Sequence, residues 1–161
     1  MELLFRQRML SWLDSYDIYD ERGRTVYTVK GVVSWGHKLK IYDAHGRQVG
    51  MVKEKKLTLL PRFLLYEGGD KVGSLRKKVT MLRPRFKLDF RNWDIDGDVW
   101  EWNWRIEDGR GDTVMRAHKK LLSFTDTYVM DIRDPRDALH CLMVVLAIDA
   151  AQCTAEKRED N

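Results

Sequence analysis

Short runs of alternating apolar and polar residues fill most of this chain and recur at a nearly fixed interval. Glycines repeat every 23 residues, at Gly23, Gly46 and Gly69. The positions three and six residues further on repeat as well: Val26, Val49, Val72, Val29, Val52 and Leu75. A fourth copy runs from Ile106 to His118, which is 88 residues after Ile18 to Lys30. Self-similarity at one period predicts a single architecture built from copies of one unit.

Each copy has the pattern of a β-hairpin. In the first, aromatic and β-branched residues at 16–20 and 26–30 flank the polar turn Glu21-Arg22-Gly23-Arg24. A glycine in such a turn adopts a positive φ without steric cost. Two strands per copy give about ten to twelve antiparallel strands, and a sheet of that size avoids exposed edges by closing on itself. The sequence therefore predicts a mainly β protein, a closed antiparallel barrel of about twelve strands.

A second connection repeats between the hairpins. It carries a small hydroxyl residue and a large apolar one, as in Leu57-Thr58-Leu59-Leu60-Pro61. We expect the apolar tip of this connection to fold back onto the sheet. Residues 87–104 fit the period poorly, and there we expect an Asp96-Gly97 hairpin turn in preference to a calcium loop.

The C-terminal segment has a different pattern, because residues 138–151 are almost wholly apolar. Asp134 followed by Pro135 predicts an N-cap and a helix start. About 16 residues span roughly 24 Å, short of the ~20 residues that a bilayer core requires. A helix that is apolar on every face must be buried, and a barrel of about twelve strands has an interior wide enough to hold it. We expect this hydrophobic helix at the centre of the barrel.

Length and composition indicate one domain over residues 1–155, with a frayed tail at 156–161. The N-terminal segment Met1–Arg8 has too short an apolar run for a signal peptide, so we expect a cytoplasmic protein, with membrane contact only at the periphery. Cys141 and Cys153 lie too far apart along one helix for a disulfide, and we expect buried thiols.

Charge is unevenly distributed along the chain. Residues 53–87 hold eleven Lys or Arg against three acids, whereas residues 89–112 hold eight acids against three Arg. Basic clusters recur at equivalent positions of successive repeats. Two interpretations stay open: the clusters merge into one patch that faces an anionic partner, or the lysines only solvate the strands and blunt strand pairing. The candidate binding residues are Lys53, Lys55, Lys56, Arg76, Lys77, Lys78, Lys119 and Lys120.

Catalytic motifs are missing from the sequence, which contains no Gly-x-Ser-x-Gly, His-Glu-x-x-His, phosphate-binding glycine loop or Cys-x-x-Cys. The four histidines have unlike settings, and we expect His140 to be a hydrogen-bonded histidine of the core or helix end. We therefore expect no enzymatic activity, no cofactor and no metal. Five tryptophans offer stacking platforms for a nucleic acid: Trp35, Trp93, Trp100, Trp102 and Trp104.

With these features the chain resembles the LURP-one-related family, within the tubby C-terminal-like superfamily that also includes phospholipid scramblases. The resemblance covers nearly the full length. It is carried by Phe5-Arg6-Gln7-Arg8, Tyr16-x-Ile18-x-Asp20-x-x-Gly23, Tyr27-x-Val29-Lys30-Gly31, and residues 53–61, 76–86, 118–128 and 138–151. It implies a twelve-stranded barrel around a central hydrophobic helix. Its tubby relatives bind phosphoinositides through basic residues of the barrel wall, and its scramblase relatives act at membranes.

Three functions remain open from the sequence. The first is a non-enzymatic module that binds anionic phospholipid headgroups through the eight basic residues. The second is a structural or protein-interaction scaffold, with the acidic stretch 89–112 or the tryptophans as the contact surface. Nucleic-acid binding ranks third, because most of the tryptophans lie in the acidic stretch.

Overall fold

Twelve antiparallel strands and one long helix make up the part of the protein that the structure describes. The computed structural model describes residues 1–5, 15–32, 34, 36–80, 85–122 and 125–159. The strands are β1 (Glu2–Phe5), β2 (Ser15–Asp20), β3 (Thr25–Gly31), β4 (Lys38–Asp43), β5 (Gln48–Glu54), β6 (Arg62–Glu67), β7 (Asp70–Lys78), β8 (Arg85–Asp89), β9 (Asp94–Asp98), β10 (Asn103–Glu107), β11 (Thr113–Leu122) and β12 (Thr125–Ile132). The helix α1 spans Ala138–Glu159.

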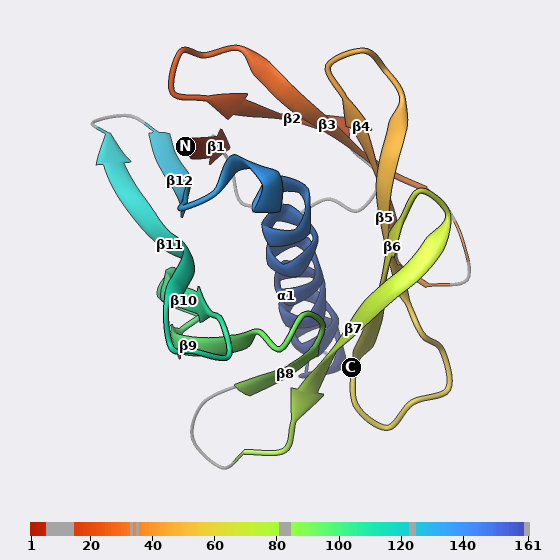
Figure 1. The fold of residues 1–161 in the computed structure, drawn as a ribbon. Helices are drawn as coiled ribbons and strands as arrows, with labels where there is room; N and C mark the ends of the chain where they lie inside the picture. Colours follow the sequence, from red (N-terminus) through yellow and green to blue (C-terminus); the bar gives the residue numbers. More distant parts are fainter. Residues whose placement is uncertain (6–14, 33, 35, 81–84, 123–124, 160–161) are drawn as a thin grey trace.

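The strands form one sheet that curls into a nearly closed barrel, as the repeat predicts (Figure 1). Its order is β8-β7-β6-β5-β4-β3-β2-β1-β12-β11-β10-β9, so that β1 and β12 join the two ends of the chain. The sheet ends at β8 and β9, which follow each other in sequence but share no ladder. A cavity of about 270 Å³ lies along this seam. Lys78 and Arg85 line one side of it, and Asp94, Asp96 and Glu107 the other.

The repeated glycine turns share one local structure. In the turns after β2, β4 and β10, the glycine N–H donates to the carbonyl of an aspartate three residues earlier at 2.9 Å. Gly23, Gly46 and Gly111 have φ of 75°, 75° and 83°. The ladder register shifts by one residue beside each turn, as expected for a type I turn closed by a glycine bulge.

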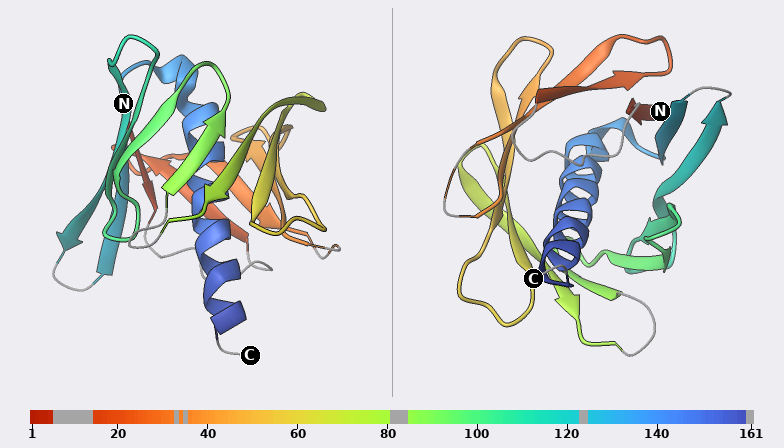
Figure 2. Two further views of the ribbon diagram at one scale, coloured as in Figure 1. Left: turned by 90° about the horizontal axis from the view of Figure 1, so that it is seen from below. Right: turned by 180° about the vertical axis from the view of Figure 1, so that it is seen from behind.

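The predicted helix lies inside the barrel (Figure 2). Asp134 caps its approach: the Asp134 side chain accepts a hydrogen bond from the Arg136 N–H at 3.0 Å, at the start of a 3-10 turn over Pro135–Asp137. Residues 141–147 are fully buried or nearly so. A Cβ on Gly50 of β5 would lie 3.1 Å from Leu139 Cδ1, which shows how closely the helix packs against the strand.

The structure corrects two expectations from the sequence, and it describes the side chain of only one of the two cysteines in a third. Asp96-Gly97 is not a hairpin turn, because both residues lie within β9, and Gly97 is opposite Trp104. A Cβ on Gly97 would lie 2.6 Å from the Asn103 carbonyl oxygen, so glycine serves close backbone approach there. The tip at Leu57-Thr58-Leu59 does not fold back, since Leu57 and Leu59 are exposed. Cys141 is buried, and burial raises the pKa of its thiol well above the ordinary value; the side chain of Cys153 lies outside the described residues.

Candidate functional site

The predicted basic residues gather at one end of the barrel, which we call the basic rim: the C-terminal ends of β5, β7 and β11 and the described parts of the connections that follow them. Successive strands are antiparallel, so all odd-numbered strands run in the same direction. Their C-terminal ends, which carry the candidate cations, therefore meet at one end. The glycine turns lie at the opposite end, beside the start of α1 (Figure 2).

Alternation along each strand divides the candidates between the two faces of the sheet. Four of the candidates are exposed and face outward: Lys53, Arg76, Lys78 and Lys120. Each lies an odd number of positions from a core residue of its own strand, which is Val52, Leu75 or Ala117. Lys77 is opposite the core residue Phe86 and shares its face. Lys119 is opposite Tyr128, with its Nζ 5.9 Å from the ring centroid.

Lys55 and Lys56 follow β5 in the connection to β6, and both are exposed. The Nζ of Lys56 lies 3.4 Å from Oε2 of Glu54, whose side chain is buried. The same carboxylate accepts a hydrogen bond from the His37 N–H at 3.0 Å. Lys56 is therefore tied to the wall, and Lys55 extends the charge at the rim.

The candidates do not form one continuous patch. Only β6 separates β5 from β7, so the cations of these two strands are near neighbours in the sheet. β11 lies on the other side of the seam, beyond β9 and β10. Lys119 and Lys120 are thus separated from the other six by the acidic strand β9, with Asp94, Asp96 and Asp98.

Cations of the even-numbered strands add to the positive charge at the basic rim, and they are not among the candidates from sequence. Register places Lys38 opposite Lys53, Arg62 opposite Arg76, and Arg85 opposite Lys78. Lys87 is opposite Arg76 on its other side. The 23-residue spacing marks only one strand of each hairpin. The signal that finds the others is the antiparallel partner of each marked position.

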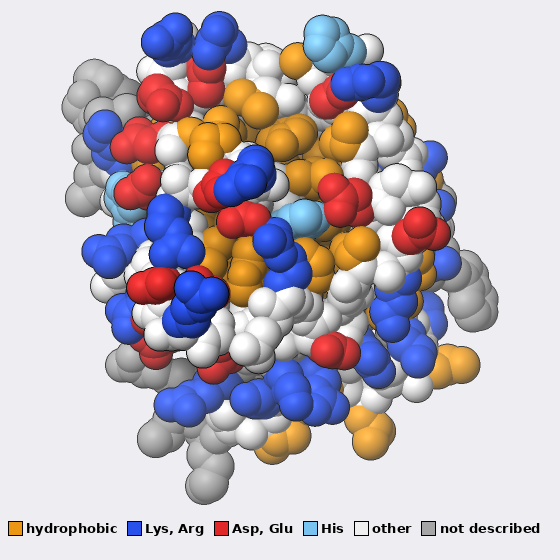
Figure 3. All heavy atoms as spheres, in the orientation of Figure 1, with side chains coloured by type: hydrophobic (Ala, Val, Ile, Leu, Met, Phe, Trp, Pro, Cys, Tyr) orange, Lys and Arg blue, Asp and Glu red, His pale blue; other side chains and the backbone are white. Residues whose placement is uncertain are grey.

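Exposed apolar side chains accompany these cations. Among the described residues, the large hydrophobic side chains that stand out in solvent are Leu57, Leu59 and Val79, with exposed fractions of 103%, 98% and 83%. All three lie in connections at the basic rim, next to Lys55, Lys56 and Lys78. The space-filling view shows orange side chains projecting beyond a blue surface at the lower edge of the molecule (Figure 3).

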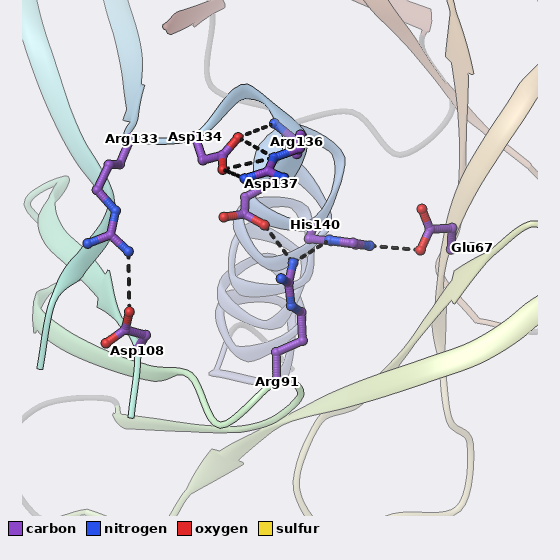
Figure 4. A network of polar contacts seen from close by, with 8 residues as sticks. All are labelled: Glu67, Arg91, Asp108, Arg133, Asp134, Arg136, Asp137 and His140. Atoms are coloured by element: carbon purple, nitrogen blue, oxygen red, sulfur yellow. Dashed lines mark hydrogen bonds and ion pairs between the residues drawn. The ribbon is translucent and has the colours of Figure 1, made fainter. Parts of the chain in front are cut away.

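A second polar cluster lies at the start of α1 (Figure 4). Of its residues, the sequence predicted only His140 to be hydrogen-bonded. Arg91 Nη1 lies 2.5 Å from Asp137 Oδ1 and 3.2 Å from His140 Nδ1. A guanidinium can only donate, so Nδ1 is the acceptor and His140 Nε2–H donates to Glu67 Oε2 at 2.8 Å. The expectation of a hydrogen-bonded histidine at the helix end is confirmed. Because both ring nitrogens are engaged, this cluster joins α1 to β6 and to the turn after β8.

Most of the candidate tryptophans that the structure describes are too buried to stack on a nucleic acid. Trp93, Trp102 and Trp104 are buried in the core, and Trp100 is partly buried against it. Trp102 packs on Phe5 and Tyr128, with ring centroids 5.3 and 4.6 Å away. Trp35 lies outside the described residues. Within the part of the chain that the structure describes, no group of three or more His, Cys, Asp or Glu is placed to hold a metal ion.

Comparison with known proteins agrees with the barrel and its central helix. The sequence pattern of the LURP-one-related family matches residues 1–149. The chain belongs to the LURP-one-related family. It is 34% identical over 150 residues to the uncharacterized protein YxjI of Bacillus subtilis, a match that covers 92% of each chain. The fold resembles the X-ray structure of a protein from Arabidopsis thaliana, with a TM-score of 0.60 and 16% identity over 92% of this chain and 90% of the other.

The helix of this LURP-one-related chain was compared with the requirements of a membrane span. Across the described residues, no helix is both long enough and apolar enough to span a bilayer.

Proposed function

We propose that this protein is a non-enzymatic binding module that docks its basic rim on an anionic phospholipid surface. The observation that carries the proposal is the position of Leu57, Leu59 and Val79. These exposed side chains lie at the same end of the barrel as the cations of β5 to β8, in the connections next to them. An apolar tip framed by lysines matches the two layers of a membrane surface, hydrocarbon below and anionic headgroups above.

The magnitudes favour measurable but reversible binding. Each Lys or Arg near an anionic leaflet contributes about 1 kcal/mol, and this contribution falls as salt rises. Full burial of a leucine side chain contributes roughly 1.5–3 kcal/mol and is insensitive to salt. Four to six cations with two or three shallowly inserted side chains would be enough for peripheral attachment.

The other candidate partners lack such support at this end of the molecule. A single-stranded nucleic acid would need accessible aromatic faces beside the cations, whereas Trp93, Trp102 and Trp104 are buried. Exposed apolar tips also occur at protein interfaces, but the lysines that flank these tips favour an anionic partner surface. Both alternatives become outcomes of the experiment below.

The test is cosedimentation with vesicles of phosphatidylcholine alone or mixed with phosphatidylserine, at low and high salt. Leu57→Ser with Leu59→Ser removes the apolar tips, and Lys55→Gln with Lys78→Gln removes two cations. We expect the leucine pair to weaken binding without changing its salt dependence. We expect the lysine pair to weaken it by about 2 kcal/mol, or roughly 30-fold, and to flatten the salt dependence.

The matched control is Arg22→Gln with Arg110→Gln, which removes the same charge from exposed turns at the opposite end. It should leave vesicle binding close to that of the wild type. Failure of the wild type to bind phosphatidylserine vesicles at low salt would overturn the proposal and favour the scaffold. Tighter retention of an oligonucleotide than of vesicles would assign the basic rim to nucleic acid.

A further inference from the structure

Three cations lie side by side on the outer wall just inside the basic rim. Arg62 of β6 is opposite Arg76 of β7, and Arg76 is opposite Lys87 of β8. Their neighbours along the strands, Phe63, Leu75 and Leu88, belong to the core, so the three cations face outward. Like charges directly opposite one another in a sheet repel, and this wall places two such pairs in one row.

These side chains surround a cavity of about 220 Å³, which Ser74 and Asp89 complete. Within the described residues, Asp89 forms no ion pair with any of the three cations. Register places it opposite Ser74, one pair of positions further from the rim. Three cations and one carboxylate leave a net charge of about +2 around the cavity, which suits a dianion.

One buried hydrogen-bond donor beside this cavity lacks an acceptor among the described residues. The Nε–H of Arg62 is buried and has no partner among the described residues, although buried donors are nearly always paired. Arg62 Nη2 donates to Ser74 Oγ at 3.3 Å. That contact uses Ser74 as an acceptor and leaves its own O–H to donate elsewhere. Buried Ser74, the Arg76 guanidinium and the Lys87 ammonium together with Arg62 supply donors from three strands.

We propose that this cavity is a binding site for a phosphomonoester group. A phosphomonoester carries a charge of about −1.5 to −2 at neutral pH and presents three strong acceptor oxygens. It therefore matches the net charge and the several donors better than a carboxylate, which offers two oxygens and one charge.

The cavity lies beside the surface that we propose docks on the membrane. The Lys77 N–H donates to the Pro61 carbonyl at 3.0 Å, which places the start of β6 against the end of β7. Arg62 follows the connection that carries Leu57 and Leu59, and Arg76 precedes Val79 by three residues. A lipid ligand for this site, a headgroup that carries a phosphomonoester, rests on the proposed function. A soluble phosphomonoester has the same chemistry.

The first arm of the test uses inorganic phosphate, with backbone amide shifts followed by NMR and chloride of equal ionic strength as the reference. We expect saturable shifts at Ser74, Arg76 and Lys87 that chloride does not produce. Arg76→Gln with Lys87→Gln should weaken the affinity about tenfold or more, and Arg22→Gln with Arg110→Gln should leave it unchanged. Equal shifts with chloride, or undiminished affinity in the cavity variant, would overturn the site.

The second arm compares vesicles of equal surface charge that contain phosphatidic acid, a phosphomonoester, or phosphatidylserine, a phosphodiester. A preference for phosphatidic acid that the cavity variant loses would assign the site to a lipid headgroup. Phosphate binding without that preference would assign it to a soluble phosphomonoester. Vesicle binding that depends on Leu57 and Leu59, without phosphate binding or lipid preference, would refute the site and leave the proposed function standing.

Discussion

Glycine has two different tasks in this barrel. At Gly46 the backbone φ is 75°, and a Cβ would meet nothing within 4 Å, so only the backbone conformation demands glycine. At Gly97 the φ is 106°, and a Cβ would lie 2.6 Å from the Asn103 carbonyl oxygen and 2.7 Å from Trp104 Cα. The second position therefore adds a collision with backbone atoms, which cannot move aside like the end of a flexible side chain.

Alanine substitutions should separate these two tasks. Gly46→Ala is expected to lower the free energy of unfolding by about 1–2 kcal/mol, the cost of a left-handed conformation with a Cβ. Gly97→Ala should cost clearly more, because strands β9 and β10 must move apart. Urea unfolding of both variants measures the difference. Equal losses would show that the close approach at Gly97 is relieved at no cost.

At the scale of the element, carboxylates hold the hairpin turns together. Asp43 Oδ1 accepts from the backbone N–H groups of Arg47 and His45 at 2.9 Å, and its Oδ2 accepts from Arg47 Nε at 2.8 Å. These hydrogen bonds, that of the Arg47 N–H first, lower the pKa of Asp43. Asp20 repeats the arrangement with Arg24. In the fourth copy Asp112 replaces the arginine, and Arg133 from beyond β12 supplies the cation to Asp108 at 3.2 Å.

Acid should loosen the turns and the capped start of the helix. The side chain and backbone N–H of Arg136 lower the pKa of Asp134 to about 2. A carboxyl whose folded pKa is depressed stabilises the fold above its unfolded pKa, and this stabilisation is lost as the pH falls through the folded value. We expect the thermal midpoint of unfolding to decrease as the pH is lowered from about 4 to about 2.

A double variant tests the origin of this acid sensitivity. Asp20→Asn with Asp43→Asn should be less stable than the wild type at neutral pH and should lose less of its remaining stability in acid. Asp70→Asn, an exposed acid at the start of β7, serves as the control. If the double variant kept the full acid dependence of the wild type, the turn carboxylates would not be its source.

For the whole molecule, the helix is the core around which the barrel forms. Leu142 is fully buried, and so are Met143 and Val144 beside it. The inner faces of the strands pack around this helix, and their buried apolar residues form one cluster with it. Disruption of the helix surface should therefore affect the entire domain.

Leu142→Asp should unfold the protein. An uncompensated buried charge costs several kcal/mol or more, against a total stability of about 5–15 kcal/mol for a typical domain. Leu142→Met keeps the volume and should cost less than about 1.5 kcal/mol. Circular dichroism and tryptophan fluorescence report the folded fraction. A folded Leu142→Asp variant with an unchanged thermal midpoint would show that this helix face is not enclosed.

The sequence by itself determined the repeat, the hairpins and the buried helix, because hydrophobic period, turn glycines and the Asp134 cap act between residues near one another in the chain. It also placed Lys53, Arg76 and Lys119 at one end of the barrel, since copies of one unit present equivalent positions alike. Only the tertiary structure decided which cations are neighbours. Arg62, Arg76 and Lys87 meet through ladder register, and β11 is separated from β7 by the open seam. Sheet curvature and strand register bring together residues far apart in the chain, and no local period encodes them.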